Sequence, residues 1–425
     1  MNIYYMRYIN FDNIPENREW AFESVRSTEQ WTHGYHRYPA KFLPDVVRKI
    51  IEDYAQDSTL IADLFAGCGT TLVEAKVHGI SSVGTDINPV AQLITKVKTT
   101  ALSPIALQQA YDVLVKLFAE YSESDYAGIQ KHDRIDYWFT QPQKAKIAFL
   151  YDKISHLDVN DDIKDFFYVC ISHILKNCSW WLQTSTKPQR DMEKKPEDPF
   201  EEFCRHCKKM IGWNEKFYNE LNGKGRLDTL CEIHLEDARH TSIHAGSINA
   251  IITSPPYVTS YEYADIHQLT AYWMEYMSDI QEFRKKFIGS SYSGNTSLTV
   301  SGSKQAQKIV NALSEKSMHI ARDVAQYFND MQEVAKEMSR VLAPNGYACI
   351  VIGNTKIKEV QIKSAEVFFE FLRNAGLRKV NVIKRSIPYK LMPTLRDNNT
   401  GRFTKLDNPN CKKVYPNEYI IIMRK

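Results

Sequence analysis

Four consecutive residues, Ser254, Pro255, Pro256 and Tyr257, follow a short apolar stretch, "NAIIT". Proline donates no backbone hydrogen bond and fixes its own φ angle, so the two prolines predict a stiff, extended turn at the end of a strand. Such a turn directs backbone carbonyls and the Ser254 hydroxyl out of the carboxyl edge of a sheet, where ligands bind in open α/β sheets. An ordinary strand-ending turn is the alternative, so other motifs must decide.

A glycine-rich turn lies nearer the N-terminus, in "TLIADLFAGCGTTLVEAKVHG". The pattern predicts a buried strand, a tight turn at Gly67 and Gly69, and a helix. Asp86 ends the next predicted strand about twenty residues later, where an acid meets a ribose hydroxyl in nucleoside-binding folds. The third glycine of a dinucleotide fingerprint would fall at Leu72, so a nucleoside carrying an amino acid is a better candidate ligand.

Composition places these motifs in an ordinary globular protein. The 425 residues are 43% hydrophobic and 25% charged, and their number suggests two or three modules. The sequence has no apolar run of about 18 residues, and its first residues lack the apolar core of a signal peptide. We expect a cytoplasmic protein without membrane segments, whose eight scattered cysteines stay reduced.

Charge is concentrated toward the C-terminus. Residues 384–425 carry ten Lys or Arg against three acids, although the net charge of the whole chain is only +3. A basic segment of this kind predicts contact with a polyanion, and a solvated basic surface is an equal alternative.

The order of "DLFAGCGTT", "GTDINP" and "TSPPY" resembles the amino-group DNA methyltransferases that use S-adenosylmethionine, particularly the N4-cytosine type. "HGYHRYPAKFLP" (33–44) is similar to a further cofactor-binding motif of that family. "LEDAR" (235–239) is similar to the strand end that supplies an acid near the adenine. "VLAPNGYACIVIGN" and "IPYKLMPTLRDNNTGRF" also resemble parts of this group, so the resemblance touches most of the chain.

The resemblance implies a set of cofactor-binding residues. Asp63 would lie near the amino group of the methionine part, Asp86 at the ribose and Asp237 at the adenine amino group. Pro39 and Ala40, with Lys41 and Phe42, would wall the site from the other side, although a core turn is an equal alternative for the last two. The full set is Lys41, Phe42, Asp63, Phe65, Gly67, Gly69, Thr70, Asp86, Asn88 and Asp237.

The resemblance also gives the proline turn a chemical role. The amino group of a base is conjugated with its ring, so its lone pair is poorly available for attack on a methyl group. The Ser254 hydroxyl and the Pro255 carbonyl could accept its N–H hydrogens, and the prolines would hold these acceptors in place. Tyr257 would stack on a base flipped out of the duplex. No metal or covalent nucleophile is required, so Cys68 is expected to be a packing residue.

The expected fold is α/β, a doubly wound, Rossmann-like methyltransferase sheet with helical insertions. The predicted divisions are an N-terminal extension (1–30), a cofactor-binding part (31–100), a mostly helical insertion with a charged linker (101–228), catalytic strands with the Ser-Pro-Pro-Tyr turn (229–257), a second insertion that is a candidate for target recognition (258–325), and the rest of the methyltransferase domain (326–425). A basic loop at 386–416 would face DNA through Lys390, Arg396, Arg402 and Lys405.

Two patterns remain open to more than one interpretation. Cys204 and Cys207, followed by Cys231 and His234, have a spacing similar to a zinc ribbon. "CEIHLEDAR" looks like a strand, in which residues three apart point to opposite faces, so we predict no metal site. The aromatic residues of the second insertion could line a base pocket or fill a core, and the core interpretation is favoured for the last two: Tyr261, Tyr263, Tyr272 and Trp273.

The predicted function is transfer of a methyl group from S-adenosylmethionine to the N4 amino group of cytosine in double-stranded DNA. A restriction-modification system with a cognate endonuclease is the expected setting. The alternatives are the same reaction on the N6 of adenine, a base amino-group methyltransferase acting on RNA, and a nucleic-acid-binding module with an inactive cofactor site. Ser in place of Asp or Asn before the prolines favours cytosine only as a tendency.

Overall fold

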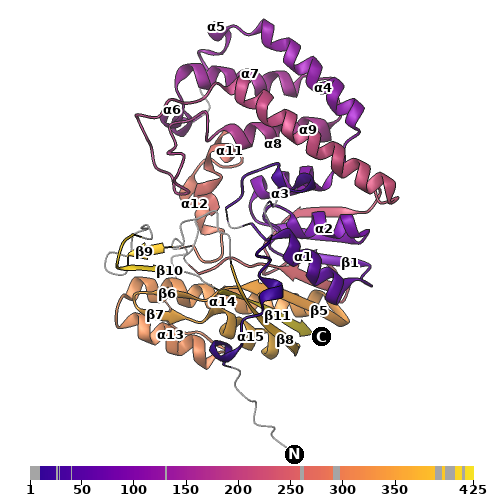
Figure 1. The fold of residues 1–425 in the computed structure, drawn as a ribbon. Coiled ribbons are helices and arrows are strands. Elements are labelled where there is room, and N and C mark those ends of the chain that lie inside the picture. The colour runs from indigo at the N-terminus through magenta and orange to yellow at the C-terminus, as the bar shows by residue number, and fades with distance from the viewer. Residues whose placement is uncertain are drawn as a thin grey trace, which may run out of the picture.

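A seven-stranded sheet forms the centre of the computed structural model (Figure 1), which describes residues 10–24, 27, 29–39, 41–129, 132–258, 263–290, 297–387, 395–397, 407–413 and 417–425. Its strands are β1 (Leu60–Asp63), β2 (Ser81–Asp86), β3 (Cys231–Leu235), β4 (Ile248–Thr253), β5 (Leu342–Ile352), β8 (Arg378–Ser386) and β11 (Asn417–Arg424). Their order is β3-β2-β1-β4-β5-β11-β8. Neighbours pair in parallel except β11, which is antiparallel to both β5 and β8. The predicted doubly wound fold is confirmed, and its chain order reverses between β1 and β4.

Helices cover both faces of this sheet. One layer contains α1 (Pro44–Ile50), α2 (Thr70–His78) and α3 (Pro89–Thr99), and the other contains α13 (Lys304–Ser314), α14 (Met318–Val341) and α15 (Ser364–Asn374). Along β5, Ile350 and Ile352 pack with α14 and α15, while Cys349 and Val351 pack with α1. Successive strand residues point to opposite faces, so a strand covered on both sides must be apolar throughout.

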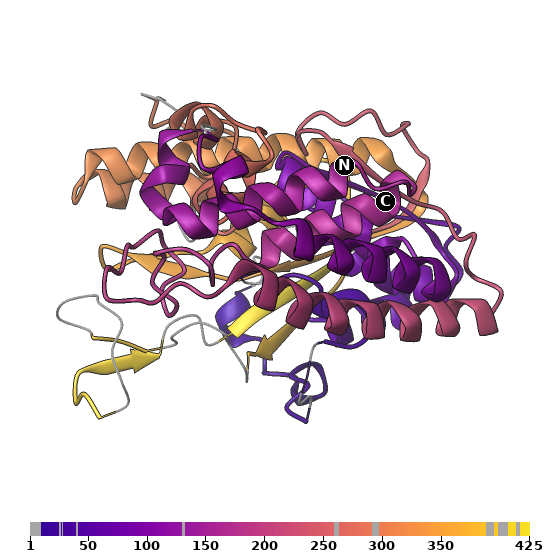
Figure 2. The same ribbon diagram turned by 90° about the horizontal axis from the view of Figure 1, so that it is seen from above.

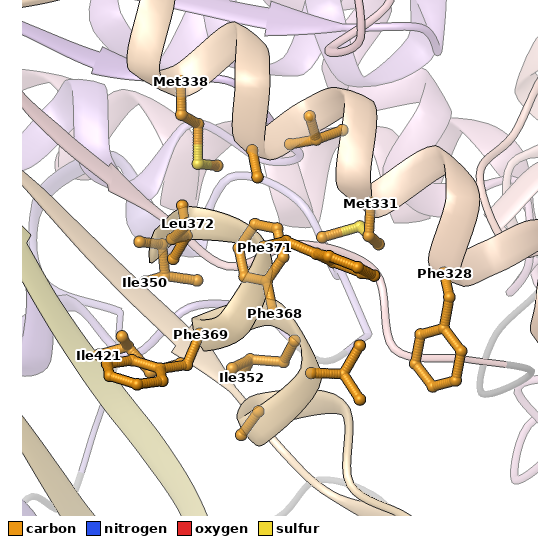
Figure 3. Packing of buried hydrophobic residues seen from close by; sticks show 14 of the residues in the cluster. Phe328, Met331, Met338, Ile350, Ile352, Phe368, Phe369, Phe371, Leu372 and Ile421 are labelled. Carbon is orange, nitrogen blue, oxygen red and sulfur yellow. The ribbon is translucent and has the colours of Figure 1, made fainter. Parts of the chain in front are cut away.

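The packing of α14 and α15 on the sheet is dense (Figure 3). Leu372 of α15 lies beside Ile350 of β5, and Phe369 of α15 lies beside Ile421 of β11; all four belong to one buried apolar cluster with Met331 of α14. Burial of each side chain of this size stabilises the fold by about 1.5 to 3 kcal/mol. This layer therefore fixes the position of β5 and β11, whose ends contribute to the site.

A separate group of helices lies between β2 and β3 in the chain. It consists of α4 (Pro104–Lys116), α5 (Glu123–Tyr126), α6 (Asp133–Trp138), α7 (Gln141–Ser155), α8 (Asp161–Ile174) and α9 (Pro199–Gly223). These helices gather at one end of the molecule and overlie the sheet when viewed from that end (Figures 1 and 2). They pack on α3 through one apolar cluster that includes Ile94, Phe166 and Phe203.

The stretch 184–209, whose prolines and charges predict a linker or a DNA-facing loop, is partly helical, so that prediction is wrong in its second half. Residues 184–198 are largely irregular, but α9 begins at Pro199 and contains Cys204 and Cys207. The Asp198 side chain caps α9 by accepting from two backbone amides. Phe203, Cys207 and Met210 recur at helical spacing and are buried, so this stretch gains apolar packing that an irregular linker would forgo.

The second insertion contributes short helices beside this group. They are α10 (Tyr263–Ile266), α11 (Gln268–Trp273) and α12 (Ile280–Lys285). Tyr272 and Trp273 are buried in the same apolar cluster as α8, which confirms the core interpretation for both. Tyr261 and residues 291–296 of the Gly/Ser-rich stretch lie outside the described residues.

Two small hairpins complete the strands. β6 (Thr355–Ile357) pairs with β7 (Val360–Ile362), and β9 (Leu395–Asp397) pairs with β10 (Cys411–Lys413). No helix among the described residues is long and apolar enough to cross a membrane.

The N-terminal segment 10–24 runs along β8, the last strand of the sheet. The backbone amide of Asn17 donates to the Lys384 carbonyl at 2.8 Å, and Glu16 forms a β-bridge with Lys384. Phe11 is buried in the core on the α14 face, whereas Trp20 is buried in the core on the α1 face. The segment therefore reaches both sides of the sheet at its edge.

Candidate active site

The glycine turn connects the end of β1 to the start of α2. Gly67 and Gly69 have φ angles of +52° and +74°, and Gly69 is the N-cap residue of α2. A Cβ atom at Gly69 would lie 2.8 Å from the Thr95 side chain, and the Thr95 hydroxyl donates to the Gly67 carbonyl at 3.1 Å. Only glycine satisfies both the left-handed conformation and this close approach to α3.

Asp86 ends β2, as predicted, and is hydrogen-bonded to this turn. It accepts from the backbone amide of Gly67 at 2.8 Å and from that of Asn88 at 2.9 Å. Burial raises the pKa of Asp86 to about 6 although these hydrogen bonds oppose the shift. The carboxylate is thus held at the carboxyl edge of the sheet, where a ribose would meet it.

Asp63 ends β1 and links it to β4. It accepts from the Thr253 hydroxyl at 2.6 Å and from the backbone amide of Phe65 at 3.0 Å. Burial raises the pKa of Asp63 to about 6, against the effect of these hydrogen bonds. Because Thr253 directly precedes Ser254, this contact sets the glycine turn and the proline turn at neighbouring strand ends.

Tyr38 packs against the glycine turn. A Cβ atom at Gly67 would lie 3.4 Å from the Tyr38 hydroxyl. The Tyr38 ring stacks with that of Tyr263 at 6.0 Å between centroids and lies 5.0 Å from the ring of His267. Residues 39–42 of the segment 33–44 were expected to wall the site, whereas their neighbour Tyr38 was not singled out.

Lys41 and Phe42, the residues proposed for that wall, have other contacts. The Lys41 ammonium donates to the His33 carbonyl at 3.3 Å, and Phe42 is partly buried against the core beside α1. Pro39 is partly buried, and Ala40 lies outside the described residues.

Asn88 caps α3 and contacts a histidine from the second insertion. Its side-chain oxygen accepts from the Val90 amide at 3.0 Å, so its nitrogen must donate to Nδ1 of His267, 2.8 Å away. His267 then carries its proton on Nε2, which is buried without a partner among the described residues. Burial lowers the pKa of His267 to about 4, so the ring is neutral. A single histidine in an insertion gave no sequence signal for this contact.

Asp237 lies two residues beyond β3, next to Asp86. The backbone amide of Glu236 donates to the Asp86 carbonyl at 3.0 Å. Both oxygens of Asp237 accept from the Arg239 guanidinium, at 3.0 Å and 2.6 Å, and Arg239 also donates to Asp330 of α14 at 2.7 Å. Burial favours the neutral acid, but the Arg239 hydrogen bonds outweigh it and hold the pKa of Asp237 below its ordinary value.

The proline turn is held from several sides. The Ser254 hydroxyl donates to the Val351 carbonyl of β5 at 3.0 Å, and the Tyr327 hydroxyl of α14 donates to the Pro256 carbonyl at 3.0 Å. Pro255 is buried. Tyr257 donates to the Glu418 carboxylate at the start of β11, at 3.2 Å. The hydroxyl oxygen of Ser254 keeps its lone pairs for a further donor.

Thr70 and Cys68 belong to the packing around the glycine turn. Both are buried, with the Cys68 sulfur 3.7 Å from the Thr70 hydroxyl. Phe65 is partly buried against the core on the α14 face.

The other sequence candidates are not brought together. Cys204 and Cys207 lie on α9, whereas Cys231 and His234 lie on β3, and the described residues contain no group of three or more potential metal ligands. Of the basic residues proposed to face DNA, Lys390, Arg402 and Lys405 lie outside the described residues. Arg396 is described only as part of β9, opposite Lys412 in the hairpin.

Comparison with known proteins identifies the family. Residues 5–96 and 248–425 match the N6/N4 methyltransferase family, described as DNA methylase. The Type II methyltransferase M.MvaI of Kocuria varians is 27% identical over 407 residues, covering 90% of this chain and 89% of that protein. The Type II methyltransferase M.MjaII of Methanocaldococcus jannaschii is 24% identical over 473 residues, covering 89% and 81%.

A solved S-adenosylmethionine-dependent methyltransferase of Methanosarcina mazei matches over 88% of this chain and 96% of its own at 10% identity, with a TM-score of 0.30. The family match extends over both turns of the site and most of the chain. This protein therefore belongs to the DNA methylase family of S-adenosylmethionine-dependent amino methyltransferases.

Proposed function

We propose that this DNA methyltransferase modifies the N4 amino group of cytosine in a base flipped out of double-stranded DNA. The observation that carries the proposal is the Asp63–Thr253 hydrogen bond, which sets the Ser-Pro-Pro-Tyr turn beside the glycine turn. The turn proposed to bind the base and the turn proposed to bind the methyl donor then lie at the ends of adjacent strands. The serine before the prolines favours cytosine over adenine.

The residues of the glycine turn fit S-adenosylmethionine. Gly67 and Gly69 give the turn a left-handed backbone that brings it to the carboxyl edge of the sheet, and Asp86 offers a carboxylate to ribose hydroxyls there. Asp63 would serve the methionine end and Asp237 the adenine, with Asp237 shared between the adenine amino group and Arg239. When bound, S-adenosylmethionine supplies an electrophilic methyl group and a neutral thioether leaving group.

The proline turn acts on the base. The Ser254 hydroxyl oxygen and the Pro255 carbonyl accept the N–H hydrogens of the amino group, which favours a pyramidal nitrogen with an available lone pair. These acceptors cost little reorganisation because Val351, Tyr327 and the prolines already fix the turn. Tyr257 supplies the stacking surface for the base.

DNA and a restriction system complete the proposal. The C-terminal segment is strongly basic, so we assign contacts with the phosphate backbone of DNA to four of its residues: Lys390, Arg396, Arg402 and Lys405. The curated relatives are named as Type II methyltransferases, which supports a cognate endonuclease acting on the same site.

Mass spectrometry of nucleosides tests the reaction. DNA and RNA are treated separately with the enzyme and isotopically labelled S-adenosylmethionine, then digested to nucleosides. We expect label in N4-methylcytosine from DNA only. Labelled N6-methyladenine would reassign the target base, and label in RNA alone would reassign the substrate.

A substitution separates catalysis from binding. Ser254→Ala removes one acceptor for the amino group and leaves the prolines, Tyr257 and the cofactor residues in place. We expect the single-turnover methylation rate at saturating DNA and cofactor to fall about tenfold, with cofactor affinity unchanged. A wild-type rate would show that the turn acts without the hydroxyl.

A further inference from the structure

A chain of polar contacts connects Tyr257 to the N-terminal segment. The Tyr257 hydroxyl donates to one carboxylate oxygen of Glu418, 3.2 Å away. The other oxygen of Glu418 pairs with the Arg385 guanidinium. Arg385 also donates from Nε to the backbone carbonyl of Trp20 at 2.6 Å.

Strand pairing in the sheet places Glu418 between its two partners. Glu418 and Arg385 are directly opposite each other in the β11–β8 pairing. Tyr419, the next residue of β11, is opposite Ile352, which precedes Gly353 at the end of β5. The carboxylate is therefore held between the proline turn on one side and the edge strand on the other.

Burial makes the ion pair unusual. The side chains of Arg385 and Glu418 are 3% and 13% exposed. A buried charge pair is a weak source of stability because desolvation offsets much of its attraction, so its presence beside the site calls for a reason. A fixed carboxylate is a strong acceptor for a neutral hydroxyl donor, and the pairing with Arg385 holds the Glu418 carboxylate in place.

The ring of Tyr257 has little freedom on its β5 side. A Cβ atom at Gly353 would lie 2.9 Å from Cε2 of the Tyr257 ring, so a side chain there would displace it. Burial and the neighbouring Glu418 raise the pKa of Tyr257 well above its ordinary value, which keeps the hydroxyl protonated as a donor. The ring is thus confined by backbone on one side and tethered at its hydroxyl.

We infer that Glu418 is a positioning residue that holds the Tyr257 ring for stacking on the flipped base, and that Glu418 is held by Arg385, which in turn donates to the Trp20 carbonyl. The inference rests on the proposed function, because it gives Tyr257 the base as its partner. It assigns a role to the N-terminal segment, since the Trp20 carbonyl completes the chain of contacts.

A double-mutant cycle tests the inference. Tyr257→Phe removes only the hydroxyl, Glu418→Ala removes the acceptor, and the double variant removes both. The rate measured is single-turnover transfer of tritiated methyl groups to unmethylated bacterial genomic DNA at saturating cofactor and DNA. We expect each single variant to be slower by about tenfold. The double variant should be no slower than either, because both substitutions remove the same hydrogen bond between Tyr257 and Glu418.

Controls separate positioning from folding. Tyr347→Phe is the matched tyrosine control, since Tyr347 lies at the far end of β5 against Tyr54 and Arg424. Cofactor affinity by calorimetry should match wild type in every variant. If Glu418→Ala fails to fold, Glu418→Gln retains the side-chain size and enters the same cycle.

Two outcomes would overturn the inference. A Glu418 variant that slows transfer equally in the wild-type and Tyr257→Phe backgrounds acts on something other than the tyrosine hydroxyl. Methylation at the wild-type rate by Tyr257→Phe would show that the Tyr257–Glu418 hydrogen bond does not contribute to catalysis. Absence of methyl transfer by the wild-type protein would instead overturn the proposed function, and this inference with it.

Discussion

The two halves of the site are held together in different ways. In the cofactor half, Asp86 and Asp63 bind backbone amides of their own turn, and the Asp86–Gly67 contact spans only 19 residues. In the base half, the proline turn is held by residues 71 to 161 positions away, from α14, β5 and β11. A short motif thus builds the glycine turn, although Asp63 also accepts from Thr253, 190 positions away, whereas the proline turn depends throughout on the assembled fold. Damage to the base half should therefore leave cofactor binding intact.

Asp86→Ala should have the largest effect and should be confined to the cofactor half. It removes a charged acceptor for ribose hydroxyls and leaves the buried amides of Gly67 and Asn88 without it. Each such loss amounts to about 1 to 3 kcal/mol, so we expect S-adenosylmethionine affinity to fall about a hundredfold. Calorimetry on the folded variant gives the answer, and unchanged affinity would take Asp86 out of the site.

Tyr257→Ala should act on the base half alone. A stacking platform contributes about 1 to 3 kcal/mol per base, so DNA capture and single-turnover methylation should weaken about thirtyfold. Cofactor affinity should remain that of wild type because the hydrogen bond and the close backbone contact of Tyr257 are with β11 and the end of β5. A parallel loss of cofactor affinity would show that the two halves are coupled more tightly than their contacts indicate.

Acidification should separate cofactor binding from stability. The pKa of Asp63 and that of Asp86 are both raised to about 6, so between about pH 4 and pH 6 the folded protein holds protons that the unfolded chain has lost. The free energy of unfolding should then decrease as pH rises through this window. Cofactor affinity should increase over the same window, by about tenfold per pH unit for one essential carboxylate.

Calorimetry and thermal unfolding between about pH 4 and pH 8 measure both trends. Asp86→Asn is the control. Its side chain cannot titrate, so the part of the pH dependence of cofactor affinity that is due to Asp86 should disappear. Affinity that does not vary below pH 6 in the wild-type protein would contradict an ionised carboxylate at the ribose.

The basic C-terminal segment should give the smallest effect per residue. If Lys390, Arg396, Arg402 and Lys405 meet phosphates, neutralising each one should lower the slope of log affinity against log salt by about one. Binding to all DNA sequences should weaken alike, and cofactor affinity should not change. An unchanged slope in the fourfold variant would identify the segment as a solvated surface.

Local chemistry explains what the sequence could predict. The glycine turn, the strand-ending Asp86 and the helix that closes at Gly79, whose φ is +77°, all follow from residue types within a few positions of one another. The proline turn was also placed correctly at the carboxyl edge of the sheet, because two prolines can only end a central strand. These features needed no knowledge of distant segments.

The unpredicted contacts join segments far apart in the chain. Tyr38 lies over Gly67, His267 binds Asn88, and Glu418 binds Tyr257, yet none of these partners carries a local signal. Such contacts form only when the whole sheet has assembled and brings the distant segments together. The N-terminus of α9 was missed for a different reason, since its prolines and charges resemble a linker until the buried stripe on the helix is counted.

The N-terminal segment also affects how the folded protein behaves at high concentration. β8 is the last strand of the sheet, and an unpaired strand edge offers a template for another chain. Asn17 occupies the Lys384 carbonyl on that edge, while the exposed part of the strand, which contains Val380, begins with the basic residues Arg378 and Lys379. The N-terminal segment covers one part of β8, and positive charges on the other part repel those of a second copy. Both features disfavour pairing between the edge strands of two molecules. A segment that supports the base half through Trp20 thereby also protects the protein from edge-to-edge aggregation.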